Sequence, residues 1–174
     1  MQDFVHLHVH TQYSLLDGQA SVARLVDKAM KNGMKGIAVT DHGNMFGIKE
    51  FTNYVNKKNS GPKGEVKDLK KRIAGIEAGT IECEDKEAEI AACKAKIVEA
   101  ENKLFKPIIG CEMYVARRTM DLKEGKPDQS GYHLIVLAKN ETGYHNLIKL
   151  VSHAWTRGYY MRPRTARSEL EKYH

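Results

Sequence analysis

The sequence has few cysteines and no long apolar run, and both absences limit what the protein can be. Its three cysteines, Cys83, Cys93 and Cys111, form no CxxC pair, so neither a disulfide framework nor a zinc ribbon is indicated. We expect free, mostly packed thiols in a reducing compartment. No run approaches the roughly 18 apolar residues of a membrane span, and no signal-peptide pattern precedes the first predicted strand. The sequence therefore predicts a cytoplasmic protein with no membrane partner.

The composition is that of a globular protein, with 174 residues, 41% hydrophobic content and one tryptophan. Such a chain is long enough to bury one substantial core. The net charge of +6 is uneven, because residues 60–106 carry ten basic and ten acidic side chains. Part of the excess comes from four arginines near the C-terminus: Arg157, Arg162, Arg164 and Arg167. They predict a solvated basic loop, with contact to nucleic-acid phosphates as the alternative.

The segment 4–11 alternates apolar and histidine side chains, with Val5, Leu7 and Val9 between His6, His8 and His10. This period of two predicts a strand with an apolar face and an imidazole face. Imidazoles on one face need hydrogen bonds or a metal if they are buried. The sequence therefore favours a metal cluster, and exposed or hydrogen-bonded histidines on an edge strand are the alternative.

A strand, helix and strand follow one another in the first 40 residues. Residues 22–30 have helical spacing of apolar side chains, with Ser21 as N-cap and Gly33 as C-terminal signal. Residues 36–40 form a short run typical of a buried strand. Asp41 and His42 come directly after it, where α/β sheets place their sites. A tight turn with an aspartate cap is the other interpretation.

Residues 48–55 predict a second helix, which the polar stretch 56–62 should end. Two seams of apolar residues with alternating steps of three and four then follow, at 66–76 and 90–104. Two such seams separated by a turn predict an antiparallel helical hairpin. We interpret residues 63–105 as an insertion into an α/β body.

Two apolar strands are predicted after the hairpin, at 106–115 and 132–138. Glu112 is the single acid of the first strand and should need a cation there. His133 opens the second strand, and a helix at 144–155 follows it.

Six side chains lie at or just after the ends of the predicted strands: His8, His10, Asp17, His42, Glu112 and His133. Imidazole and carboxylate ligands together fit Zn, Mn or Fe. Six ligands exceed one tetrahedral ion, so a cluster of two or more metals is implied. Such clusters generate a bound hydroxide near neutral pH and clamp a phosphoryl group. We therefore predict phosphoester hydrolysis, with no catalytic residue beyond the ligands.

The order of these motifs resembles the PHP (polymerase and histidinol phosphatase) superfamily. The resemblance is carried by His8-Val9-His10-Thr11, Leu16-Asp17-Gly18, Thr40-Asp41-His42-Gly43-Asn44, Gly110-Cys111-Glu112 and Tyr132-His133-Leu134. Within it, residues 41–47 and 142–147 are similar to the N-terminal domain of bacterial replicative DNA polymerases.

The resemblance implies a distorted seven-stranded (β/α) barrel with up to three divalent metals, and the six side chains match its ligand positions. His6 and Asp41 would support ligands through hydrogen bonds. The last ligands and strands of the family are absent, so we expect residues 1–174 to be the N-terminal part of the domain, an incomplete barrel. We expect partial metal binding and little catalysis from it alone.

Three functions remain open. In the first, the parent is a DNA-directed DNA polymerase, with Mg in a polymerase part not present here, and the PHP module is a phosphoesterase such as a 3′–5′ exonuclease. In the second, the module is a metal-stabilised scaffold that docks the proofreading exonuclease. In the third, it is a stand-alone phosphatase. The first two imply DNA and other replicative holoenzyme subunits as partners.

Overall fold

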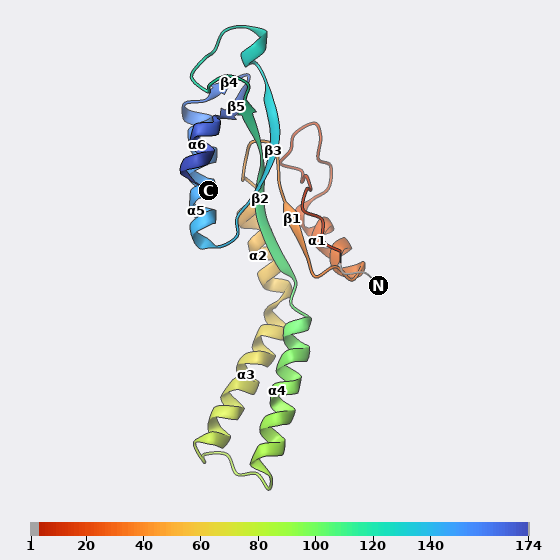
Figure 1. Cartoon of the computed structure of the whole chain (residues 1–174). Helices are drawn as coiled ribbons and strands as arrows, with labels where there is room; N and C mark the ends of the chain where they lie inside the picture. Colours follow the sequence, from red (N-terminus) through yellow and green to blue (C-terminus); the bar gives the residue numbers. More distant parts are fainter. Residues whose placement is uncertain (1–3, 174) are drawn as a thin grey trace. The chain divides into compact units, whose positions relative to one another are not determined.

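The computed structural model describes residues 4–173 (Figure 1). In chain order its elements are α1 (Val22–Lys31), β1 (Gly36–Val39), α2 (Ile48–Lys58), α3 (Ser60–Glu77), α4 (Lys86–Asn102), β2 (Lys106–Ala116), a 3₁₀ turn (Lys126–Asp128), β3 (Gly131–Leu137), α5 (Glu141–Thr156), β4 (Tyr159–Tyr160), β5 (Arg162–Thr165) and α6 (Arg167–Lys172). The chain forms two compact units, residues 1–53 with 107–174, and residues 54–106. Among the described residues, no helix combines the length and apolar character needed to cross a bilayer.

The first unit is a mixed α/β structure organised around β2. Strand β5 pairs with β2 in parallel at Tyr114 and Val115. Strand β1 is the other neighbour of β2, and a parallel bridge between His42 and Glu112 continues this side of the sheet. Strand β3 pairs with β2 antiparallel, with Glu112 opposite Ile135. The connection from β2 to β3 contains only a 3₁₀ turn and no crossover helix, so the chain returns in the opposite direction.

The alternation of side chains along β2 separates the core from the opposite face. Cys111 and Met113 pack into a core with residues of α5, among them Leu147 and Leu150. Glu112 lies between them in sequence and therefore points to the other face. Burial raises the pKa of the Cys111 thiol to about 12. The prediction of free thiols is confirmed, because all three cysteines are unpaired.

The prediction of a regular strand at residues 4–11 is wrong, since this segment has no strand conformation. It does lie along β1, where His6 O accepts from Ala38 N–H and Val9 O accepts from Thr40 N–H, both at 2.9 Å. The four residues from His6 to Val9 thus lie opposite the three from Ala38 to Thr40, and one extra residue on one side is what defines a bulge. The bulge interrupts the alternation, and Leu7 is 51% exposed.

The C-terminal region contains two short strands, β4 and β5, that the sequence patterns did not predict. The expectation of a solvated basic loop is wrong for Arg164, which is fully buried. Its guanidinium donates to the carbonyls of Gly158, Met120 and Leu122. Because arginine offers several donors in a fixed plane, one side chain can tie a loop to a strand.

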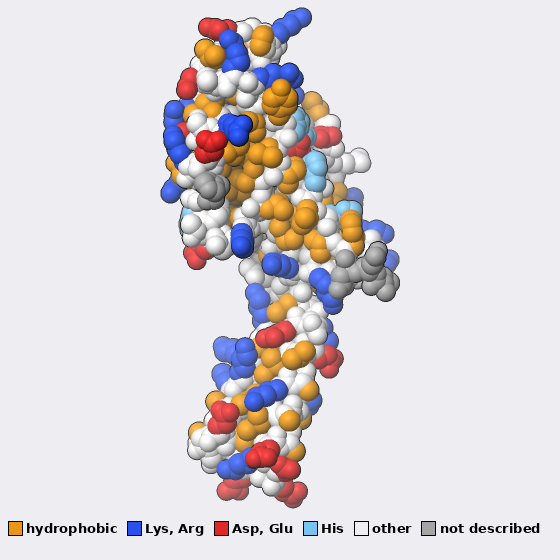
Figure 2. Space-filling model, viewed as in Figure 1, with side chains coloured by type: hydrophobic (Ala, Val, Ile, Leu, Met, Phe, Trp, Pro, Cys, Tyr) orange, Lys and Arg blue, Asp and Glu red, His pale blue; other side chains and the backbone are white. Residues whose placement is uncertain are grey.

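In the second unit, α3 and α4 pack against each other (Figure 1). The polar stretch 56–62 does not separate two helices as expected, because only Asn59 lies between the end of α2 at Lys58 and the start of α3 at Ser60. Pro62 lies in the first turn of α3, where a missing N–H is tolerated. Asn59, just before α3, is joined to Phe105, just after α4, because its side chain accepts from Phe105 N–H (2.9 Å) and donates to Phe105 O (2.8 Å). Figure 2 shows acidic and basic side chains mixed over these helices. That this region is an insertion stays a prediction.

Candidate metal centre

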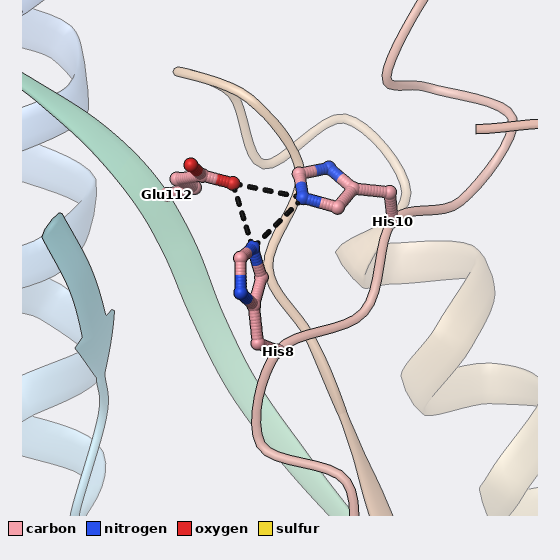
Figure 3. Close-up of side chains that lie close together, drawn as sticks. All are labelled: His8, His10 and Glu112. Atoms are coloured by element: carbon pink, nitrogen blue, oxygen red, sulfur yellow. Dashed lines mark hydrogen bonds and ion pairs between the residues drawn. The ribbon is translucent and has the colours of Figure 1, made fainter. Parts of the chain in front are cut away.

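Three of the predicted ligands, His8, His10 and Glu112, point toward one another (Figure 3). Glu112 Oε2 lies 2.8 Å from His8 Nε2 and 2.8 Å from His10 Nε2, and the two histidine nitrogens are 2.9 Å apart. The ligand atoms of a tetrahedral zinc site lie about 3.3 Å apart, given bonds of about 2.0–2.1 Å. The three side chains are therefore near ligand spacing.

Two further groups of side chains adjoin this one, and the three groups together include all six predicted ligands. His42 Nε2 lies 2.6 Å from Asp17 Oδ2, and these two residues group with His10. His42 Nδ1 lies 3.4 Å from Glu112 Oε2, and both group with His133, whose Nδ1 contacts Glu112 Oε1. The structure thus brings together side chains up to 125 positions apart in sequence, from His8 to His133.

Glu112 is the residue that links the groups. Its side chain is almost completely buried, yet it faces four histidines. Burial raises its pKa, but hydrogen bonds with His8 and His133 and the charges of His42 and His133 outweigh burial, so the pKa lies below its usual value. Glu112 is therefore an anion at neutral pH, as a metal ligand must be.

Asp41 supports the ligand His10 through Ser14. Its buried carboxylate accepts from Thr11 N–H at 2.7 Å, from the Thr11 hydroxyl at 2.8 Å and from the Ser14 hydroxyl at 2.6 Å. Ser14 Oγ also lies 2.8 Å from His10 Nδ1. Since the one hydroxyl proton of Ser14 goes to Asp41, the Ser14 oxygen must accept a hydrogen bond from His10 Nδ1–H. This fixes the His10 tautomer and leaves the lone pair of Nε2 free.

The resulting arrangement of lone pairs fits a bound cation. In neutral His10 the Nε2 lone pair faces the Glu112 carboxylate at 2.8 Å. Protonation of His10 would relieve the contact, but burial, the main cause, lowers the pKa of His10. His42 Nδ1 is buried beside them and has no hydrogen-bond partner. Bound metal at the groups that contain these nitrogens would satisfy each of them together with the carboxylate, so the donor set fits a Zn-, Mn- or Fe-type site.

His6 is placed differently from the six. It is exposed, and its ring packs edge-on against Phe4 at 4.7 Å. Among the described residues, His6 belongs to none of the three groups of side chains that could hold a metal. The Asp41 carboxylate reaches His10 through Ser14, a residue to which the sequence patterns assigned no role. A serine four positions after a ligand is the only signal the sequence offers for it.

Comparison with known proteins agrees with this geometry. The PHP domain family matches residues 6–174. Curated proteins described as "DNA polymerase III subunit alpha" are similar to the chain: that of Borreliella burgdorferi is 41% identical over 173 residues and that of Treponema pallidum 40% over 162 residues. These alignments cover 98% and 92% of the chain. They cover only 11% and 10% of the relatives, so the chain spans about a tenth of their length.

Proposed function

The chain belongs to the PHP domain family, and on this premise we propose that its first unit is a metal-dependent phosphoesterase that acts on the 3′ end of DNA. The observation that carries the proposal is the convergence of four histidines and two carboxylates in three adjoining groups. Mixed nitrogen and oxygen donors of this kind are typical of hydrolytic metal centres.

The donor atoms favour two ions. His8, His10 and Glu112 Oε2 offer three donors to one ion. The group of His42, Glu112 and His133 offers three donors to a second ion, with His133 against Glu112 Oε1 and His42 Nδ1 3.4 Å from Oε2. His10 has only one free nitrogen, because Ser14 occupies the other, so it cannot also complete a third set with Asp17.

The chain's own residues then have distinct tasks. When bound, the metal ions supply the positive charge and Lewis acidity that phosphoester hydrolysis requires. Glu112 holds two donor groups at a fixed separation through its two oxygens. Ser14 and Asp41 keep His10 in the tautomer that can ligate. Asp17 is 61% exposed and bonded to His42, which places the most accessible carboxylate at the outer side of the centre.

The relatives suggest where such a module works. Because they are described as alpha subunits of DNA polymerase III, we propose that the chain is part of a replicative DNA polymerase with DNA and other replication subunits as partners. Polymerase activity with Mg would reside outside these residues. A scaffold that docks a proofreading subunit is the second candidate, since a metal that joins β2 and β3 to the segment 4–17 would also stabilise the fold.

The deciding experiment measures bound metal and hydrolysis of single-stranded DNA in the natural protein that carries this sequence. The double variant His8→Ala/His10→Ala removes two ligands, and His145→Ala, an exposed histidine of α5, is the matched control. We expect two metals and 3′ hydrolysis, both lost in the double variant and retained in the control. Metal without hydrolysis of any DNA end would favour the scaffold. Hydrolysis of small phosphate monoesters alone would favour a stand-alone phosphatase.

A further inference from the structure

A pocket of about 460 Å³ opens beside the candidate metal centre, and His42 lines it. Its size is in the range of small-molecule sites. Three exposed aromatic rings give it a stacking surface, which we name the aromatic shelf: Phe46, Trp155 and Tyr159. None of these residues is needed for the metal centre, so the shelf calls for a separate explanation.

The rings of the shelf are ordered but not covered. Trp155 and Tyr159 are stacked, with centroids 5.5 Å apart and an interplanar angle of 19°. Phe46 lies 6.2 Å from Trp155. Trp155 Nε1 donates to Gly43 O at 2.8 Å, so the indole is fixed next to His42 and its N–H is satisfied. Phe46 is still 65% exposed, Tyr159 48% and Trp155 42%, which leaves ring surface free for a planar ligand.

The ribbon of β4 and β5 brings a cation to the same pocket. Tyr159 pairs with Pro163 and Tyr160 with Arg162, so Met161 is the single residue at the turn, with φ of +61°. A non-glycine residue in this left-handed region is strained and persists only where the surroundings hold it. The tight turn keeps Tyr159 and Arg162 on the wall of one pocket.

The charge of the pocket is complementary to a phosphate. The Arg162 guanidinium lies 5.6 Å from the ring of Tyr114, and both line the pocket. Among the described residues that line it, none is acidic and Arg162 is the only Lys or Arg. A purely apolar occupant would bury this guanidinium without an anion, which is unfavourable. Rings beside one cation are instead the combination that binds single-stranded nucleic acid.

We propose that the aromatic shelf stacks the 3′-terminal base of a single DNA strand while Arg162 contacts a neighbouring phosphate. This inference rests on the proposed function, because a base on the shelf lies next to His42 and so places the adjoining phosphodiester at the metal centre. It adds a substrate preference: the chain should select single strands that end in an intact base.

Trp155 provides the test, because it is the only tryptophan of the chain. We would titrate the 174-residue chain with a short thymidine oligonucleotide and follow tryptophan fluorescence, first without added metal and then with Zn²⁺. The control strand is identical except for an abasic 3′ terminus. The expected result is quenching by the intact strand and at least about fivefold weaker binding of the abasic one.

Two variants with matched controls separate the contribution of the aromatic shelf to DNA binding from that of Arg162. Phe46→Ala should weaken binding about tenfold, whereas Ile148→Ala, an exposed apolar residue outside the pocket, should leave it unchanged. Arg162→Gln should weaken binding several-fold and lower the salt dependence, the slope of log affinity against log salt, by about 0.7. Arg167→Gln removes the same charge at an exposed site outside the pocket and should do neither.

The titration separates this inference from the proposed function, since it needs no turnover. Quenching that depends on the terminal base, without hydrolysis in the natural protein, would support the shelf and overturn the phosphoesterase. Hydrolysis that is equal for intact and abasic ends would overturn the shelf alone. Equal binding of both strands, or an unchanged affinity in Phe46→Ala, would also overturn it.

Discussion

Two glutamates of the first unit are buried to the same degree but are compensated differently. Glu169 of α6 is 3% exposed and lies 2.7 Å from Lys172 Nζ and 2.9 Å from His153 Nδ1. Glu112 of β2 is 4% exposed and is surrounded by histidines. Among the described residues, no lysine or arginine forms an ion pair with Glu112. One carboxylate thus has a permanent cation in the chain, and the other does not.

The comparison shows how a structural carboxylate differs from a ligand. A buried anion with a lysine at hydrogen-bond distance is already neutralised and has no need of a metal. An anion that only histidines surround has no lysine or arginine to neutralise it, and the same imidazole nitrogens and carboxylate can ligate a divalent cation. Glu169 is therefore the structural reference for Glu112.

The largest effect should come from Glu112→Gln, which removes the charge that links the donor groups. We expect the affinity for Zn²⁺ or Mn²⁺ to fall by more than about 100-fold, the upper end of losses for residues that only support ligands. Isothermal titration would measure it. Glu169→Gln is the matched control and should leave metal affinity unchanged; a comparable loss in both variants would contradict the distinction.

Metal removal should destabilise the wild-type fold but not the Glu112→Gln variant. At a free metal concentration of 100 times Kd, binding contributes about 2.7 kcal/mol to the free energy of unfolding, which corresponds to about 5–10 °C in Tm for a chain of this size. Thermal unfolding with and without a chelator would measure the difference. An equal chelator effect on both proteins would show that the metal binds elsewhere.

Ser14→Ala tests the support of the centre without removal of a ligand. The loss of the hydroxyl frees the His10 tautomer and leaves Asp41 with one donor fewer. We expect metal affinity to fall about 10- to 100-fold, measured by competition with a chromophoric chelator. Ser152→Ala, an exposed serine of α5, serves as the control. If Ser14→Ala kept the wild-type metal affinity, Ser14 and Asp41 would have no role in support of the metal ligands.

The smallest effect concerns acid stability at Glu169. Hydrogen bonds from Lys172 and then His153 lower the pKa of Glu169 below its usual 4.5. A lowered folded-state pKa stabilises the fold above about pH 4.5, and this stability is lost as the pH falls through the folded-state pKa. Glu169→Gln should therefore make Tm less dependent on pH below about 4.5. Tm measured from pH 6 to pH 3 for wild type and variant would reveal it, and parallel curves would count against it.

Local patterns predicted most of the elements around the site. The helix α1 follows from its apolar spacing, and Ser21 and Gly33 mark its ends as expected, with Ser21 bonded to Arg24 N–H and Gly33 at φ +77°. The strands β1, β2 and β3 follow from runs of apolar and β-branched residues. These signals are local, because capping, glycine conformation and burial of a short run depend on residues within a few positions.

Non-local contacts account for the errors. The bulge that offsets the segment 4–11 arises from its pairing with β1, about 30 positions away, and the strand β5 exists because it pairs with β2. The basic stretch predicts a surface position for Arg164, yet its side chain is buried and donates to the carbonyls of Met120 and Leu122, more than 40 positions away. A pattern of charge or period two carries no information about a partner of this kind.

The sequence by itself determined the chemical identity of the site: which imidazoles and carboxylates are present, and their order along the chain. Only the tertiary structure decided that Glu112 joins the donor groups, that Ser14 and Asp41 fix His10, and that Trp155 lies beside His42. Ligand types can be read from side-chain chemistry. Convergence depends on strand register and on backbone paths such as the turn at Met161, and these are set by contacts between residues far apart in the chain.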